Sequence, residues 1–93
     1  MGQYVFLNDR FVDRENAVVG IYDHGFLYGD GAFEGIRSYS RRIFRLQEHV
    51  DRLYRSAHAL AIDLVLPKSD FFDAVVETAK KNDLDTGYIR VSI

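Results

Sequence analysis

Four glycines lie within residues 23–35, in a stretch whose other residues are mostly apolar or aromatic: Gly25, Gly29, Gly31 and Gly35. Glycine weakens a helix, and it adopts positive φ or lets a neighbouring group approach the backbone closely. The stretch is therefore predicted to be a tight, irregular loop and not a regular helix. It lacks the G-x-x-x-x-G-K-[ST] pattern, and β-prone residues follow Gly31, so these features do not favour a nucleotide-binding loop.

The segments around this loop predict strands first and two long helices later. Residues 4–7 and 10–12 are short β-prone runs, and Asn8-Asp9 between them suits a two-residue hairpin turn. Residues 36–39, 43–46 and 88–93 are also expected to be strands. Apolar spacing of i, i+3, i+4 and i+7 predicts helices over residues 47–61, with Ala61 on the apolar stripe, and 67–81. The fold class is thus α+β: one small domain with an antiparallel or mixed sheet and two helices.

Composition limits the classes of protein that fit. The chain of 93 residues is long enough for one domain, residues 1–93, and 47% hydrophobic with 28% charged residues is ordinary globular composition. A net charge of −2 gives no reason to expect nucleic acid or a membrane as partner. Zero cysteines exclude a disulfide scaffold and a cysteine-ligated zinc site. No signal-peptide pattern or apolar run of about 20 residues is present, so a cytoplasmic location is expected.

Three polar side chains are candidates for binding anions. Arg52 lies within a predicted helix, and its planar fork of donors suits phosphate, although the local sequence favours a surface ion pair with Glu48 at i, i+4. Tyr88 and Arg90 alternate in a predicted strand, so they share one face and could bind a carboxylate. Exposed sheet residues of these types are also common, and the local pattern leaves both interpretations open.

Histidines and lysines give weaker indications. His24, His49 and His58 show no metal-ligand spacing, so a surface or structural role is expected for each and no metal site is predicted. The only lysines are found at the polar ends of one predicted helix: Lys68, Lys80 and Lys81. A lysine that bonds covalently to a carbonyl cofactor needs a desolvated pocket or cationic neighbours. We therefore expect no catalytic residue in this chain.

Taken together, the motifs match a known family in order and spacing. Residues 23–37 (DHGFLYGDGAFEGIR), 42–46 (RIFRL) and 48–53 (EHVDRL), followed by Ser56-Ala57, Asn82 and Tyr88-Ile89-Arg90, resemble the fold-type-IV pyridoxal-phosphate aminotransferases of the branched-chain type. The resemblance covers almost the whole chain. It implies a small N-terminal α+β domain, with the cofactor held between it and a larger C-terminal domain absent from this chain. Because residues 88–93 are an apolar strand at the chain end, we also expect the native protein to continue past Ile93.

The resemblance implies a role for six residues. Arg52 matches the arginine that binds the cofactor phosphate. Tyr28, Phe33 and Gly35 match positions that line the substrate pocket, and in dimers of the family the loop that carries Tyr28 reaches toward the neighbouring subunit's site. Tyr88 and Arg90 match residues that help bind substrate carboxylates. The cofactor lysine and the acidic residue at its pyridine nitrogen belong to the C-terminal half of such proteins.

The activity implied for the parent protein is transfer of the amino group of leucine, isoleucine or valine to 2-oxoglutarate. The resemblance also implies a homodimer or higher homo-oligomer, and we expect the 93-residue chain alone to be inactive. Three alternatives remain: a D-amino acid aminotransferase or an aminodeoxychorismate lyase on the same scaffold, and a non-catalytic assembly module built from this domain. A reading frame that continues into a lysine-bearing half would distinguish the enzymes from the module.

Overall fold

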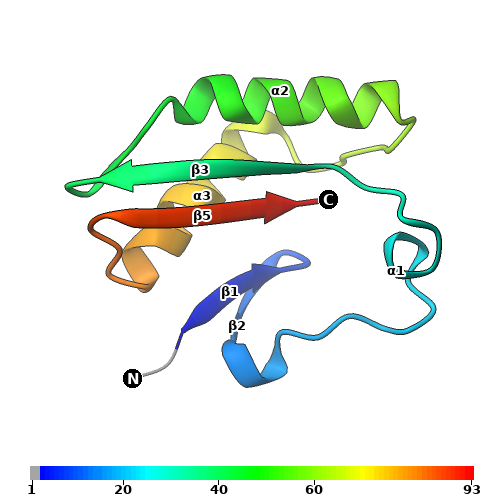
Figure 1. The fold of residues 1–93 in the computed structure, drawn as a ribbon, viewed down its shortest axis with the longest axis horizontal. Helices are drawn as coiled ribbons and strands as arrows, with labels where there is room; N and C mark the ends of the chain where they lie inside the picture. The colour runs from blue at the N-terminus through cyan, green and yellow to red at the C-terminus, as the bar shows by residue number, and fades with distance from the viewer. Residues whose placement is uncertain (1–2) are drawn as a thin grey trace.

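The computed structural model describes residues 3–93. Its elements run in the order β1 (Tyr4–Leu7), β2 (Arg10–Asp13), η1 (Arg14–Asn16), α1 (His24–Tyr28), β3 (Phe33–Tyr39), β4 (Arg42–Ile43), α2 (Leu46–Ala59), α3 (Lys68–Lys81) and β5 (Gly87–Ser92) (Figure 1). The strands form two antiparallel sheets, β1–β2 and β4–β3–β5. This arrangement confirms the predicted α+β class.

The sheet formed by β3 and β5 packs one face against the two long helices. Burial alternates strictly along β3, so that Glu34, Ile36 and Ser38 point inward while their neighbours point outward. Ile36 joins Leu46, Val50, Val75 and Ile89 in the buried cluster, which brings α2, α3 and both strands together. The alternation follows from the period of two in a strand, and the helix stripe follows from the period of 3.6. The opposite face of the β3–β5 pair is therefore left uncovered, and we call it the open face.

The helix α2 begins earlier and ends earlier than its predicted range. Of residues 43–46, predicted to be a strand, only Ile43 lies in one, at the end of β4, because Arg45 adopts a left-handed conformation (φ 52°) and turns the chain into α2 at Leu46. At the other end, Leu60 donates to the carbonyls of Ser56 and Ala57, and Ala61 (φ 57°) leaves the helical path. Ala61 is therefore exposed and does not extend the apolar stripe, contrary to the sequence prediction.

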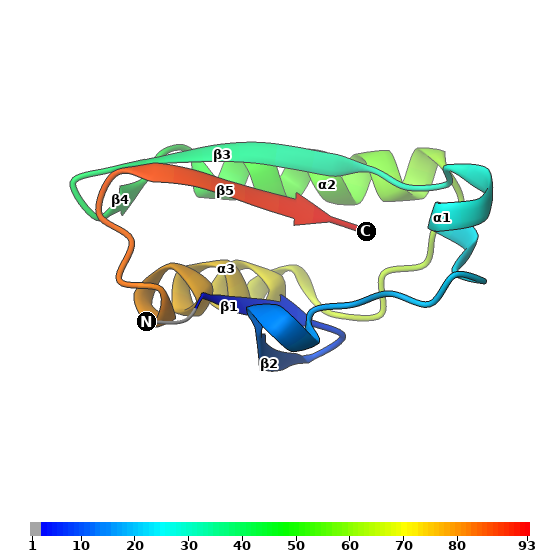
Figure 2. The same ribbon diagram turned by 60° about the horizontal axis from the view of Figure 1, so that its bottom comes forward.

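The N-terminal hairpin packs against α3 (Figure 2). Asn8 and Asp9 both have positive φ (49° and 72°), as a tight two-residue hairpin turn requires, so this prediction is confirmed. Asn82, which follows α3, links the end of this helix to strand β1. Its Oδ1 accepts from the Tyr4 N–H at 2.8 Å, and its Nδ2 donates to the Tyr4 carbonyl at 2.9 Å.

The glycine-rich stretch contains a short helix, α1, which the prediction of an irregular loop missed. Asp23 caps it, with Oδ2 accepting from the Gly25 N–H at 3.0 Å, and Gly29 ends it in the left-handed conformation (φ 72°). The side-chain cap and the terminal glycine offset the low helix propensity of Gly25. Among residues 3–93, the longest helices are too short and too polar to cross a bilayer.

Candidate functional site

Four of the predicted site residues share the open face of the β3–β5 pair. Phe33 and Gly35 alternate outward along β3, and Tyr88 and Arg90 alternate outward along β5. The register places Gly35 opposite Arg90. The sequence prediction that Tyr88 and Arg90 share a face is therefore confirmed, and the pairing adds Phe33 and Gly35 to the same surface.

Arg90 lies over an aromatic ring on this face. Its Cζ is 4.1 Å from the centroid of the Phe33 ring, and its Nε donates to Ser92 Oγ at 3.2 Å. A cation over the face of an aromatic ring is held by the ring's negative quadrupole. The contact thus places one positive charge beside an exposed apolar ring, at the edge of a shallow hollow that Gly31 and Ala32 also line.

Tyr88 occupies the space that a side chain at position 35 would need. A Cβ built on Gly35 would come within 2.6 Å of the Tyr88 hydroxyl oxygen and 3.0 Å of its Cε1. Gly35 therefore contributes to this surface by leaving room for the Tyr88 ring. The phenol remains more than half exposed, and its hydroxyl can donate to a ligand.

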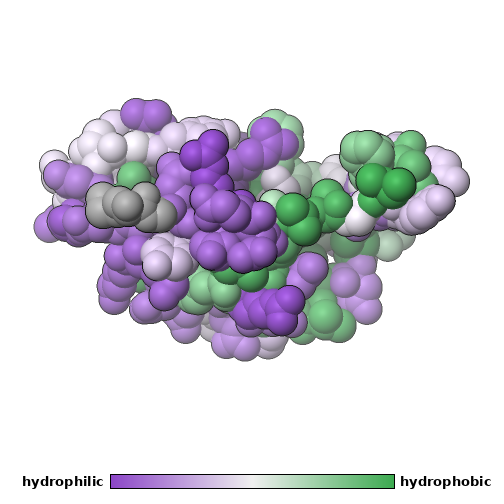
Figure 3. All heavy atoms as spheres, turned by 90° about the horizontal axis from the view of Figure 1, so that it is seen from below, coloured by the Kyte–Doolittle hydropathy of each residue, from purple (hydrophilic) through white to green (hydrophobic). Residues whose placement is uncertain are grey.

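Tyr28 lies apart from this sheet face, at the end of α1. Its ring packs at 4.7 Å from that of His24, whose Nδ1 lies 2.6 Å from Asp30 Oδ2. The Tyr28 side chain is highly exposed, and so are Val18, Ile21 and Phe26 nearby in the chain. Figure 3 shows hydrophobic side chains gathered toward the end of the molecule where α1 lies.

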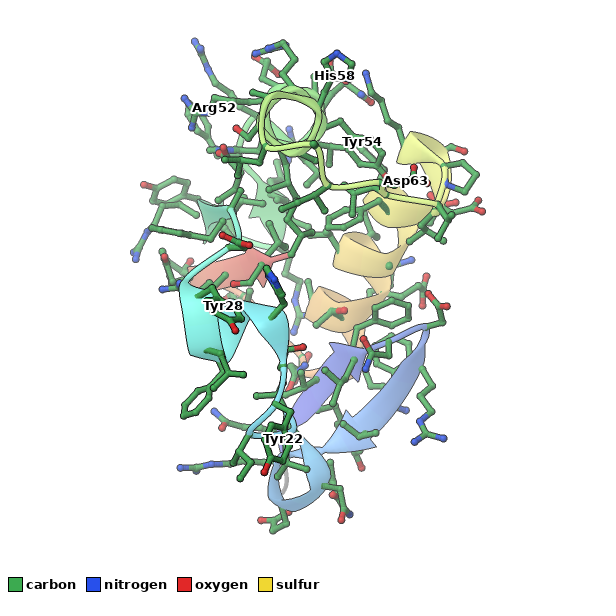
Figure 4. All side chains as sticks on the ribbon, turned by 90° about the vertical axis from the view of Figure 1, so that its right-hand side faces the viewer. Tyr22, Tyr28, Arg52, Tyr54, His58 and Asp63 are labelled. Atoms are coloured by element: carbon green, nitrogen blue, oxygen red, sulfur yellow. The ribbon has the colours of Figure 1, made fainter. Side chains whose placement is uncertain are left out.

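Arg52 extends from α2 and pairs with Glu34, whose side chain lies on the opposite, helix-covered face of the sheet. Figure 4 shows it beside α2, with Tyr28 below it on the same side of the molecule. Its Nε donates to Glu34 Oε2 at 2.8 Å and its Nη2 donates to Glu34 Oε1 at 2.7 Å. The alternative surface pair between Arg52 and Glu48 is not formed. Glu48 Oε2 instead lies 3.9 Å from Arg45 Nε.

Glu34 and His49 complete this cluster; the sequence analysis did not single out Glu34, and it assigned His49 only a surface or structural role. His49 Nδ1 lies 2.7 Å from Glu34 Oε1, and the side chains of Glu34 and His49 are only 7% and 18% exposed. The hydrogen bonds from Arg52 are the main reason that the pKa of the Glu34 carboxyl lies below its ordinary value of 4.5; burial opposes the shift, and His49 adds to it. The available signal was the alternation of Glu34 with Ile36 and Ser38, which places a carboxylate on the inward face.

One edge of the Arg52 guanidinium stays free for an anion. Glu34 occupies the edge formed by Nε and Nη2, whereas the side chain as a whole is 60% exposed. The remaining N–H groups of Nη1 and Nη2 have the paired geometry that binds phosphate. A phosphate therefore fits this arginine without displacing Glu34. The three lysines are all exposed, so none has the desolvated surroundings of a covalent cofactor lysine.

Comparison with known proteins agrees with these features. The family described as amino-transferase class IV matches residues 31–93. A protein of Methanocaldococcus jannaschii named "Putative branched-chain-amino-acid aminotransferase" is 51% identical over 89 residues, which cover 96% of this chain and 31% of that protein. D-alanine aminotransferase of Staphylococcus haemolyticus is 37% identical over 87 residues, covering 94% of this chain and 31% of that protein.

Solved structures give the same result for the fold. The branched-chain aminotransferase of Thermoproteus uzoniensis with norvaline superposes with a TM-score of 0.91 at 37% identity, over 99% of this chain and 33% of that one. The branched-chain amino acid aminotransferase of Escherichia coli has a TM-score of 0.93 at 32% identity, over 100% and 33%. A further branched-chain amino acid aminotransferase, solved with pyridoxamine 5′-phosphate, has a TM-score of 0.92 at 33% identity, over 99% and 32%.

The fold is thus that found in solved branched-chain aminotransferases. The chain belongs to the class IV aminotransferase family. It spans about a third of the length of the relatives and structures that it matches. The resemblance found from the motifs is confirmed.

Proposed function

We propose that this chain forms the substrate-facing small domain of a pyridoxal-phosphate aminotransferase for branched-chain L-amino acids. The observation that carries the proposal is the shared open face, where an apolar ring and a guanidinium lie together at Phe33 and Arg90. The similarity to branched-chain aminotransferases supports it. Activity, dimeric assembly and a cytoplasmic location belong to the whole protein and are part of the proposal.

The open face suits substrates that share a carboxylate and differ in their side chains. Arg90 offers a fixed positive charge that can pair with the carboxylate of an amino acid or of the glutamate side chain. The Tyr88 hydroxyl can donate to the same group, and the Phe33 ring offers an apolar wall for a branched side chain. Such a surface can accept leucine and 2-oxoglutarate in turn. In the proposal, Tyr28 completes a pocket by reaching toward a neighbouring subunit.

The cofactor would contact this chain through Arg52. When bound, pyridoxal phosphate supplies the electron-withdrawing ring that makes amino transfer possible. The free Nη1–Nη2 edge of Arg52 would hold its phosphate, while the covalent lysine would come from outside these 93 residues. The protein residues described above therefore bind and orient ligands, and none of them is proposed to move a proton.

A transaminase assay with the full-length protein that carries this chain tests the proposal. Glutamate formation from 2-oxoglutarate is expected with leucine, isoleucine and valine, and not with D-alanine. Turnover of D-alanine without turnover of leucine would favour the second candidate, a D-alanine aminotransferase, which the similarity to the staphylococcal enzyme supports. The 93-residue chain assayed alone is expected to be inactive. Turnover by it would contradict the proposal that the covalent lysine lies outside these 93 residues.

A further inference from the structure

The cluster formed by Glu34, His49 and Arg52 contains a buried charge to which the proposed function assigns no role. We propose that Glu34 is a positioning residue: its carboxylate, fixed by His49, holds the Arg52 guanidinium so that the Nη1–Nη2 edge faces the cofactor phosphate. This inference rests on the proposed phosphate contact of Arg52. The alternative is that the carboxylate only satisfies a structural ion pair and lowers the positive charge available to an anion.

The geometry divides the guanidinium into a used edge and a free edge. Nε and Nη2 each donate one N–H to Glu34, at 2.8 and 2.7 Å. Among residues 3–93, no group accepts from Nη1 or from the second N–H of Nη2. A guanidinium has five N–H donors in a rigid plane, so fixing one edge also fixes the direction of the other.

Glu34 is held rigidly by the sheet, and its two hydrogen bonds order the Arg52 side chain, which would otherwise be mobile. The Arg52 side chain is 60% exposed, whereas that of Glu34 is 7% exposed and extends from a central strand, β3. An exposed arginine has many rotamers, and ordering it when a ligand binds weakens the binding. A guanidinium that is already ordered avoids this cost.

His49 holds the carboxylate from a second direction. Its Nδ1 lies 2.7 Å from Oε1, the oxygen that also accepts from Arg52 Nη2. An ionised carboxylate only accepts hydrogen bonds, so the His49 ring must donate through Nδ1. His49 precedes Arg52 by one helical turn on α2, which places both donors on the same side of the helix.

The two interpretations predict opposite effects of removing the charge on Glu34. If the carboxylate only competes with the phosphate for Arg52, then Glu34→Gln strengthens phosphate binding because one negative charge is lost. If the carboxylate positions Arg52, the same change weakens phosphate binding because the guanidinium is no longer held by two charge-assisted hydrogen bonds.

The test compares two cofactor forms in the full-length protein that carries this chain. The dissociation constants of pyridoxal phosphate and of pyridoxal, which lacks the phosphate, are measured by equilibrium dialysis for each variant. Their ratio reports the phosphate contact alone. We expect Glu34→Gln to reduce the preference for the phosphate form about three- to tenfold, the range that ordering one long side chain implies. Arg52→Ala is expected to reduce it about 10- to 100-fold.

A double variant and a matched surface variant serve as controls. In the Arg52→Ala background, Glu34→Gln is expected to change the ratio no further, because a positioning residue acts only through its partner. Asp83→Asn removes an exposed carboxylate that lies 2.7 Å from Arg41, and it is expected to leave the ratio unchanged. If Glu34→Gln does not fold, Glu34→Asp replaces it. Asp keeps the charge but is one methylene shorter, so a smaller reduction is expected.

The outcomes separate this inference from the function on which it rests. An unchanged ratio in Arg52→Ala would show that Arg52 does not bind the phosphate, and the proposed cofactor contact would fail. A reduced ratio in Arg52→Ala together with an unchanged or increased preference in Glu34→Gln would overturn only the positioning role. A melting temperature that falls in Glu34→Gln while the ratio stays constant would identify the cluster as purely structural.

Discussion

The ring of Tyr88 lies so close to the backbone of Gly35 that a methyl group at position 35 would come within 2.6 Å of the Tyr88 hydroxyl oxygen. The two residues sit on neighbouring strands, β3 and β5, and both face the open side of the sheet. The conflict involves the far end of an exposed side chain, so the ring can move away. Gly35 therefore determines where the Tyr88 hydroxyl lies more than it determines stability.

We predict that Gly35→Ala retains the fold and changes substrate binding. The expected loss in unfolding free energy is below about 1 kcal/mol, because only the Tyr88 ring must move. Because the hydroxyl moves with the ring, KM for the amino acid substrate should rise in the full-length protein. Thermal denaturation and steady-state kinetics measure the two effects.

Gly31→Ala provides a contrasting variant. Its Cβ would lie 2.6 Å from the carbonyl oxygen of Ile93, a backbone atom that also accepts a hydrogen bond from the Ala32 N–H. We expect a loss of about 1–3 kcal/mol, since the strand end must shift. Equal stabilities for Gly35→Ala and Gly31→Ala would contradict the distinction between side-chain and backbone crowding.

Stability is predicted to depend on pH through Glu34. Its folded-state pKa is lower than the ordinary value of 4.5, chiefly because Arg52 donates two hydrogen bonds to the charged carboxylate. A lowered folded-state pKa adds stability above the unfolded pKa, and this contribution disappears as the pH falls from about 4.5 through the folded value. Glu34→Gln should thus be less stable than the wild type at pH 7, by about 1–3 kcal/mol.

Denaturant unfolding at pH 7 and at successively lower pH measures this contribution. The difference in unfolding free energy between the wild type and Glu34→Gln is expected to shrink below about pH 4.5, because protonation removes the same charge that the substitution removes. Asp83→Asn, at an exposed ion pair, is expected to have little effect on the unfolding free energy at pH 7, because water screens exposed charges. A difference between wild type and Glu34→Gln that stays constant with pH would contradict the assignment to the Glu34 charge.

The elements with a strong hydrophobic period were predictable from the sequence. Val50, Leu53 and Val75 lie in the core as their spacing requires, and Asn8-Asp9 forms the expected turn. The errors occurred where local geometry overrides propensity. The left-handed conformation of Arg45 ends the preceding strand, so that α2 begins at Leu46, one residue before the predicted start. The Asp23 side-chain cap favours the short helix α1 in the glycine-rich stretch.

The candidate site was predictable only in part, for a related reason. Alternation in a strand is local, so the shared face of Tyr88 and Arg90 could be read from the sequence. The pairing of Arg52 with Glu34 depends on a helix packing against a strand, and a contact across 18 residues leaves no local pattern. The i, i+4 neighbour Glu48 suited a pair on the helix surface, yet the buried carboxylate attracted the arginine because burial makes an unpaired charge costly.

The core of α2 is predicted to carry a large share of the stability. Leu53 is fully buried, and Leu53→Ala is expected to cost about 2–5 kcal/mol, which is a large fraction of the stability of a domain of this size. Leu60→Ala is the matched control, because the same atoms are removed from a side chain that is 53% exposed just after the same helix. Its cost is expected to be below about 1 kcal/mol. Urea denaturation of both variants checks the prediction, and similar midpoints would contradict the described packing.

The exposed apolar surface around α1 is predicted to make the 93-residue chain self-associate. Six apolar or aromatic side chains within residues 18–27 are between about half and almost fully exposed: Val18, Val19, Ile21, Tyr22, Phe26 and Leu27. Water contact with so much apolar surface is unfavourable, and association removes it. Static light scattering is expected to show an average mass above that of the monomer, rising with concentration. A monomeric mass throughout would contradict the prediction.

Substitution within this surface tests whether it is the cause of association. Phe26→Ser combined with Leu27→Ser is expected to lower the average mass toward 10.7 kDa, the monomer value, because two exposed side chains are removed from the apolar surface. Val65→Ser is the control, since Val65 is 89% exposed and lies outside residues 18–27. If the control lowers the mass as much as the double substitution does, association depends on general hydrophobicity and not on the α1 surface. An effect of the double substitution alone would place the contact at α1, beside Tyr28.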